Sequence, residues 1–145
     1  MAVTAEELAL LGLSPGDDLP EGGQGLDVTV CCGTGTARTW TDVLEPLLAT
    51  RYRIHLEPGS FNLWAEFDVE WLEPAKEWAG NRKWELCPII LEEKAVGVAF
   101  RANRDAPRFL EVLSPVRLRI RLGAARDGDR IRVRFLPGSA LGAAV

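Results

Sequence analysis

The sequence has few of the residues that build metal centres and covalent cross-links. It contains a single histidine, His55, and three cysteines: Cys31 and Cys32 are adjacent, Cys87 stands alone, and no Cys-x-x-Cys spacing occurs. One histidine excludes a site with several histidine ligands, so His55 is more simply a strand side chain than a catalyst. The cysteine pattern argues against a disulfide framework or a zinc site and favours a reducing compartment.

Long apolar segments are missing as well. No apolar run approaches the length that crosses a bilayer, and the N-terminus has neither the basic region nor the apolar stretch of a secretory signal. The chain has 145 residues, 47% of them hydrophobic and 26% charged, which is enough for one globular domain with its own core. We therefore expect a cytoplasmic protein without a membrane segment.

Charge is distributed unevenly along the chain. The formal net charge is −4, but residues 101–134 carry ten arginines against four acidic residues, so this segment is +6 and the rest of the chain is −10. Such a division suggests an anionic ligand or partner for the basic segment. A solvated arginine face balanced by acidic neighbours explains it equally well.

Turn residues divide the chain into three parts. A capping box, Thr4-Ala5-Glu6-Glu7, predicts a short helix that ends at Gly12. The following segment is rich in glycine and proline, so residues 1–25 are interpreted as a helix with a flexible appendage. Residues 26–136 form the main domain, and residues 137–145 a loose tail.

Short strand-like runs dominate the main domain, with one helix at residues 41–50 and a loop at residues 73–83. Arginines alternate strictly with apolar residues over 117–122 and 130–135, on either side of Asp127-Gly128-Asp129, which predicts an antiparallel pair with its arginines outward. Many short strands with regular turns favour a mainly β fold, a compact closed barrel with one or two short helices. The remaining predicted strands cover residues 27–32, 53–57, 62–64, 67–71, 84–91, 96–101 and 109–113.

Two short motifs are candidates for a binding site. Gly33-Thr34-Gly35-Thr36-Ala37-Arg38 follows a strand-like run, and glycines allow backbone amides to approach an anion, although many ordinary turns contain the same pattern. Ser60 and Asn62 are two residues apart, so on an extended chain they share a face. Their side-chain oxygens suit Mg²⁺, unless they form a turn pair that bonds to its own backbone.

Four ordered motifs resemble those of the archaeal-type CTP-dependent riboflavin kinases, a family of cradle-loop β-barrels. Gly33 to Arg38 is similar to Gly-x-Gly-Glu-Gly followed by a basic residue, and Pro58 to Leu63 to Pro-Gly-Thr-Leu-Asn-Leu. Leu110 to Pro115 with Leu118-Arg119 is similar to Ile-Glu-Ile-Ile-Ala-Pro and Leu-Arg, and Asp127-Gly128-Asp129 precedes the last strand as in the family. The similarity covers about residues 26–136.

The resemblance implies an activity and a site. Members of the family transfer the γ-phosphoryl group of CTP to the 5′-hydroxyl of riboflavin, giving flavin mononucleotide (FMN). Mg²⁺ would be held by Ser60 and Asn62, and flavin by Asn103 and Glu111, with Glu111 also the catalytic residue. The nucleotide would lie against the following residues: Gly33, Thr34, Gly35, Thr36, Ala37, Arg38, Leu118 and Arg119.

Departures from the family pattern keep other functions open. Thr36 and Ala37 replace a glutamate and a glycine of the phosphate loop, which suggests a non-catalytic barrel that binds a flavin, a nucleotide or another phosphorylated small molecule. Apart from the resemblance, Glu111 is equally well a surface carboxylate paired with Arg108 or Arg117. The family does not explain four tryptophans, which could stack on a ligand ring or pack in the core: Trp64, Trp71, Trp78 and Trp84.

A third class of function is binding of a protein or nucleic acid through the arginine-rich segment 101–134. The arginines lack interleaved aromatic residues and the net charge of the whole chain is negative, which disfavours nucleic acid. The expected partners are therefore a flavin and a nucleotide. The sequence leaves the oligomeric state open.

Overall fold

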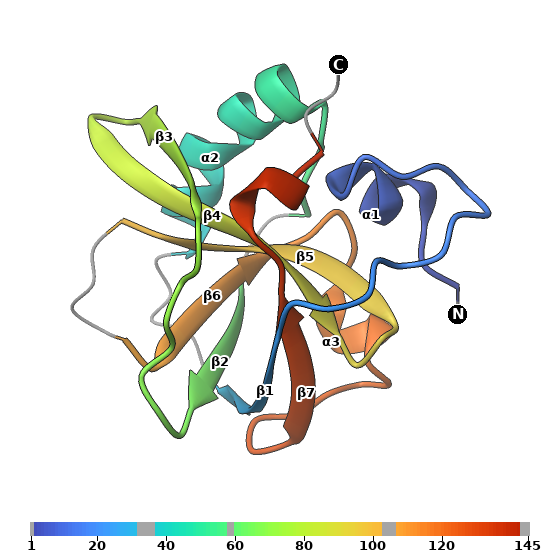
Figure 1. Cartoon of the computed structure of the whole chain (residues 1–145). Coiled ribbons are helices and arrows are strands. Elements are labelled where there is room, and N and C mark those ends of the chain that lie inside the picture. The colour runs from blue at the N-terminus through green and yellow to red at the C-terminus, as the bar shows by residue number, and fades with distance from the viewer. Residues whose placement is uncertain (1, 32–36, 58–59, 103–106, 143–145) are drawn as a thin grey trace.

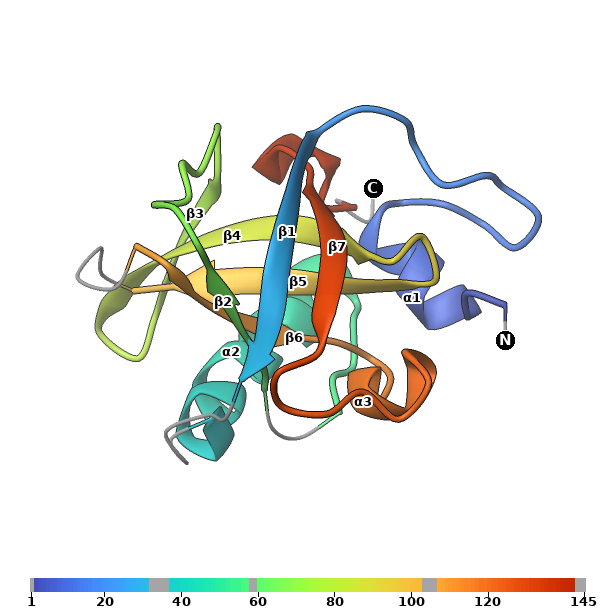
Figure 2. The same ribbon diagram turned by 90° about the horizontal axis from the view of Figure 1, so that it is seen from below.

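Six antiparallel strands close into a barrel, whose arrangement is drawn in Figures 1 and 2. The computed structural model describes residues 2–31, 37–57, 60–102 and 107–142. The order of the strands around the barrel is β4-β5-β6-β2-β1-β7, and β7 pairs with β4 to complete the ring. A seventh strand, β3 (Ala75–Ala79), pairs with the first half of β4. The barrel strands are β1 (Gln24–Cys31), β2 (Phe61–Ala65), β4 (Arg82–Leu91), β5 (Ala95–Arg101), β6 (Phe109–Leu113) and β7 (Arg130–Phe135).

Alternating residues of the strands fill the inside of the barrel. Val30, Leu63 and Val133 are almost completely buried there, while their neighbours along each strand point outward. This period of two fixes the two faces of every strand, because a shift of one residue would expose the core. The predicted fold class, a mainly β closed barrel with few short helices, is confirmed.

Two helices cover the outer face of β4 and β5. These are α1 (Ala5–Leu10) and α2 (Ala37–Tyr52), and they bury Leu10, Leu44 and Leu48 against outward residues of the two strands. Both faces of β4 and β5 are thus covered, which explains why each strand is nearly continuously apolar. Among the described residues, no helix combines the length and hydropathy needed to cross a bilayer.

The predicted N-terminal helix is confirmed together with its cap. The Thr4 hydroxyl accepts a hydrogen bond from the Glu7 amide at 3.2 Å, and the Glu7 carboxylate accepts one from the Thr4 amide at 2.9 Å. Gly12 then adopts a φ of 67°, a left-handed conformation that ends the helix and costs glycine little. At the other end of the chain, the 3-10 helix η1 (Gly138–Ala140) is followed by Leu141, which is buried in the same cluster as Leu10.

An antiparallel strand pair was predicted at 117–122 and 130–135, and the prediction is wrong for 117–122. Only 130–135 is a strand, and it pairs with β1 and β4. The other segment contains a single helical turn, α3 (Leu118–Arg121), in which Leu118 and Arg121 are buried and Ile120 is exposed. A helical turn also brings Leu118 and Leu122 to one side, so alternation over six residues does not distinguish the two structures.

Other predicted elements also differ. Residues 53–57 and 67–71 are not strands, and Arg53 has a φ of 55°, which an extended strand does not allow. The predicted loop 73–83 contains β3, and the predicted helix 41–50 is longer, running as α2 through Pro46. Pro46 and Asp42 both lie on the exposed side of α2, where water can reach the carbonyl group that proline leaves without a partner.

The arginines of β7 are balanced by acidic residues from neighbouring segments. The Arg132 guanidinium lies 3.1 Å from the Asp27 carboxylate on β1, and Arg134 lies 2.7 Å from Glu93 in the turn after β4. Arg130 lies 3.4 Å from Glu66. For these three residues the structure agrees with a solvated, balanced arginine face rather than with a surface kept free for an anionic partner.

Candidate functional site

The site begins with the register of β2 and β6. Asn62 is directly opposite Glu111, between the inward pairs Phe61–Val112 and Leu63–Leu110, so both polar side chains lie on the outer face of the barrel. Directly opposed residues of an antiparallel pair have Cβ atoms about 5 Å apart. The structure therefore brings together two predicted site residues that are distant in the sequence.

Ser60 joins this pair at the start of β2. Its hydroxyl donates a hydrogen bond to the Asn62 side-chain oxygen at 3.0 Å, and Asn62 is only 5% exposed. The prediction that the two side chains share a face is confirmed by this contact. This hydrogen bond connects the two side chains. In the alternative considered above, the side chains would instead bond to backbone groups of their own turn.

The spacing of these two oxygens fits a divalent cation. Octahedral Mg²⁺ binds oxygen at 2.0–2.1 Å, so two adjacent ligands lie about 2.9 Å apart. The Ser60 and Asn62 oxygens are 3.0 Å apart and could occupy one such edge. Within the described ranges, no group of three or more histidine, cysteine, aspartate or glutamate residues could hold a metal ion. A cation here would take its other ligands from substrate and water.

Glu111 differs from the carboxylates around it because its side chain has no partner among the described residues. In the part of the chain that the structure describes, no hydrogen bond or salt bridge reaches its side chain, and burial raises its pKa above the ordinary value. Arg108, one of the two cations considered for it, is instead 3.1 Å from Asp68. Arg117, the other, makes no salt bridge to it either, so interpretation of Glu111 as a paired surface carboxylate is wrong.

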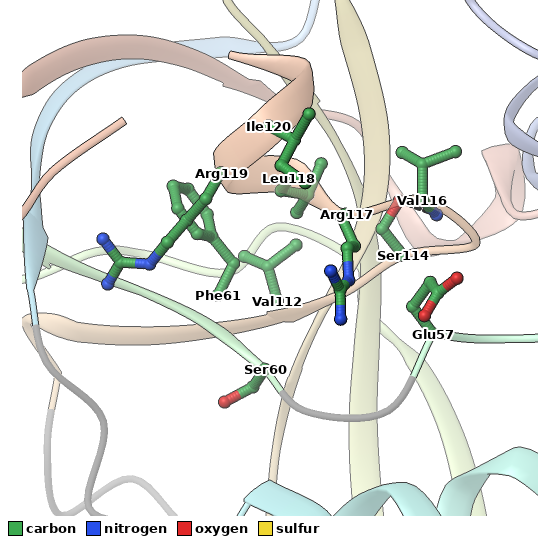
Figure 3. A pocket seen from close by; sticks show the side chains of 10 residues that line it. All are labelled: Glu57, Ser60, Phe61, Val112, Ser114, Val116, Arg117, Leu118, Arg119 and Ile120. Atoms are coloured by element: carbon green, nitrogen blue, oxygen red, sulfur yellow. Dashed lines mark hydrogen bonds between the residues drawn. The ribbon is translucent and has the colours of Figure 1, made fainter. Parts of the chain in front are cut away.

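A cavity of about 350 Å³ includes Ser60 in its lining but neither Asn62 nor Glu111 (Figure 3). Figure 3 shows residues at the start of β2 and the end of β6 on one side and the segment around α3 on the other. Ser60, Leu118 and Arg119, three predicted site residues, line the cavity. A volume of this size accommodates a small molecule or one portion of a larger one. The remaining lining residues are Glu57, Phe61, Val112, Ser114, Val116, Arg117 and Ile120.

Two arginines and one glutamate, Glu57, bring charged side chains to the cavity lining. Arg119 is held in place: its guanidinium donates hydrogen bonds to the Asp127 carboxylate at 2.7 Å and the Ala125 carbonyl at 3.1 Å, and lies 5.8 Å from the Phe61 ring centre. Arg117 is exposed and, within the described residues, its side chain forms no hydrogen bond or salt bridge. Arg117 can therefore bind an anionic group without losing an internal ion pair.

Several predicted site residues cannot be placed. Gly33, Thr34, Gly35, Thr36 and Asn103 lie outside the described residues, and Ala37 and Arg38 are described only as the backbone at the start of α2. Their predicted roles in binding nucleotide and flavin remain predictions. Cys31, the last described residue before this loop, is paired with Asn62 in the register of β1 and β2.

Sequence reasoning missed Arg117 and Glu57 as residues of the cavity. Both were assigned to strands, in which alternate side chains face solvent. In the structure the backbone amide of Glu57 donates a hydrogen bond to the Ser114 carbonyl at 2.9 Å, which fixes this segment beside the end of β6. Non-local contacts of this kind leave no periodic signal in the sequence.

No protein family model matches the sequence, and no curated protein sequence matches it. The fold therefore defines the class to which the chain is assigned. It is a mainly β protein built on a closed six-stranded antiparallel barrel.

Proposed function

We propose that this protein is a Mg²⁺-dependent phosphotransferase that moves the γ-phosphoryl group of a nucleoside triphosphate, with CTP as the donor, to the 5′-hydroxyl of riboflavin, giving FMN. The observation that carries the proposal is the arrangement of Ser60, Asn62 and Glu111. Two neutral oxygens 3.0 Å apart lie beside a half-buried carboxylate for which the described part of the chain supplies no counter-charge. The motif resemblance supplies the identity of the two substrates.

The proposal gives a role to each site residue that the structure describes. Ser60 and Asn62 hold Mg²⁺, which when bound neutralises charge on the phosphate oxygens. Glu111 accepts a hydrogen bond from the acceptor hydroxyl and takes its proton, for which a raised pKa is an advantage. Arg117 provides positive charge for phosphate, and Leu118 and Arg119 border the nucleotide. Positioning and charge neutralisation are what phosphoryl transfer mainly requires of a protein.

The test is direct turnover. The protein is incubated with riboflavin, MgCl₂ and CTP, ATP, GTP or UTP in turn, and FMN is separated by chromatography. We expect FMN with CTP, a loss of about 100-fold in kcat/KM in Asn62→Ala and Glu111→Gln, and no activity with EDTA. Glu66→Gln, which changes an exposed carboxylate just after β2, is the matched control and should retain activity. Absence of FMN with every nucleotide would refute the proposal.

The second candidate function is a barrel that binds a flavin, nucleotide or phosphorylated small molecule without turnover. Arg117 lines the cavity, and its side chain has no partner in the described ranges, which favours binding of an anionic ligand whether or not catalysis follows. Saturable binding of riboflavin or CTP, with no product at any nucleotide concentration, would identify this function. Nucleic-acid binding is less favoured, because the arginines of β7 already pair with Asp27, Glu66 and Glu93.

A further inference from the structure

Two aromatic residues extend the polar pair along the same strands. Trp64 is opposite Phe109 in the register of β2 and β6, as Asn62 is opposite Glu111. Residues two apart on a strand point to the same face, so these four side chains occupy adjoining positions on the outer face of the barrel. The aromatic pair thus borders the polar pair directly, without an intervening strand.

Trp64 is not part of the core. It is 48% exposed, whereas Trp71 and Trp84 are buried, in the barrel interior and under α2 respectively. The inward positions beside it, Leu63 and Ala65, are buried and apolar. Closure of the barrel therefore requires Leu63 and Ala65 but does not require an aromatic side chain at 64. A half-exposed indole next to a carboxylate that no described residue pairs with is a surface suited to a ligand.

The spacing matches a ligand with a flat ring and a hydroxylated chain. A strand advances about 3.3 Å per residue, so the aromatic and polar pairs are separated by about 7 Å. A chain of a few carbon atoms spans that distance. A ring stacked on Trp64 would then place the hydroxyl end of its chain at Glu111 and Asn62, where the proposed transfer occurs.

We propose that Trp64, supported by Phe109, is the residue that selects a planar fused-ring acceptor by stacking, while Glu111 receives the hydroxyl of the acceptor's side chain. The identification of that acceptor as riboflavin rests on the proposed function. The stacking surface itself follows from the register and exposure of the described residues. Trp64 acts on the affinity for the acceptor and has no part in nucleotide binding.

The test compares two exposed tryptophans. Trp64→Ala and Trp64→Phe are measured beside Trp78→Ala, which removes a 70% exposed tryptophan from β3, outside the six barrel strands. Riboflavin is titrated with each protein and its own fluorescence is followed, because stacking on an indole quenches flavin emission. We expect Trp64→Ala to weaken riboflavin binding at least 10-fold, since stacking on an aromatic side chain contributes directly to the affinity for a flat ring.

The remaining readouts separate stacking from a general effect on structure. Trp64→Phe should restore most of the affinity, with less quenching, and the KM for CTP should be unchanged in all variants. Thermal unfolding should be similar in Trp64→Ala and Trp78→Ala. Unchanged riboflavin affinity in Trp64→Ala, or an equal loss in Trp78→Ala, would overturn the inference.

The two proposals fail in different ways. If riboflavin binds through Trp64 but none of the nucleotides yields FMN, the stacking surface is supported and the kinase proposal is refuted. If FMN forms and the riboflavin KM is the same in Trp64→Ala, the kinase proposal is supported and the stacking surface is refuted. A protein that does not bind riboflavin refutes both.

Discussion

Two glutamates on the outer face of the same barrel have opposite environments. Glu7, on α1, is completely buried, and its carboxylate accepts hydrogen bonds from the Thr4 amide at 2.9 Å, the Val96 amide at 2.8 Å and the Arg121 guanidinium. Glu111, on β6, is half-buried and has no such partner among the described residues. The two carboxylates differ in their partners and not simply in their burial, because the more deeply buried Glu7 accepts more hydrogen bonds.

The two environments indicate two purposes. Glu7 connects α1 to β5 and to Arg121 of α3, so its charge holds three elements together. The Glu111 carboxylate makes no ion pair or hydrogen bond with any residue that the structure describes, and its burial makes the ionised form costly. Proteins retain such groups mainly where chemistry or binding uses them. The comparison therefore assigns Glu7 to stability and is consistent with the role proposed for Glu111.

The largest effect on stability is expected from Glu7→Ala. It leaves Arg121, whose side chain is 6% exposed, buried without its counter-charge. Loss of one member of a buried pair costs about 3–5 kcal/mol. Urea unfolding of this variant and of Glu6→Ala, which removes the exposed neighbouring carboxylate, measures the difference. A cost below about 1 kcal/mol for Glu7→Ala would show that the pair is not important for stability.

A smaller effect of opposite sign is expected from Glu111→Gln. Burial raises the pKa of Glu111 in the folded protein, so the unfolded chain releases this proton at a lower pH than the folded protein does. The folded state is therefore destabilised as the pH rises from the unfolded pKa through the folded pKa. At pH 7 the variant should therefore unfold at a higher urea concentration than the unaltered protein. The gain should disappear in acid, below the pKa of both states, because the carboxyl group is then neutral in each.

This sign distinguishes Glu111 from an ordinary surface carboxylate. The same titration of urea midpoint against pH in Glu66→Gln serves as the control, since Glu66 lies in a 3.4 Å pair with Arg130 and both side chains are well exposed. Destabilisation of Glu111→Gln at pH 7 would mean that the carboxylate has a stabilising partner, contrary to the environment described above.

The smallest effect is expected at an exposed pair. Asp27 and Arg132 are 3.1 Å apart, much as buried pairs are, but both side chains are more than half exposed. Asp27→Asn should cost less than about 1 kcal/mol, and the difference should vanish in 1 M salt, where screening is strong. Unfolding in low and high salt measures it. A cost as large as that of Glu7→Ala would show that burial is not what separates the two pairs.

Local signals in the sequence predicted part of the fold well. The capping box at Thr4 and the turn at Gly12 depend on a few neighbouring residues, and the helix forms where they place it. Apolar runs at 84–91 and 96–101 predicted β4 and β5 for the same reason. The segment 117–122 was predicted wrongly because its structure depends on Arg121 reaching Glu7, a residue 114 positions away.

The same distinction applies to the site. Ser60 and Asn62 are two residues apart, so their proximity was predictable from the geometry of an extended chain. The position of Glu111 opposite Asn62 depends on the pairing of β2 with β6. No sequence pattern specifies which of the strands become neighbours, and the assignment of Glu111 to the same site came from the family resemblance alone.

By itself, the sequence determined that the chain would form a small β-barrel, because alternation of apolar residues and turn chemistry are properties of neighbouring residues. Only the tertiary structure decided which of the two carboxylates is paired within the described part of the chain. That choice depends on the register of strands and on contacts between distant segments, through which Glu7 meets Arg121 while Glu111 faces Asn62.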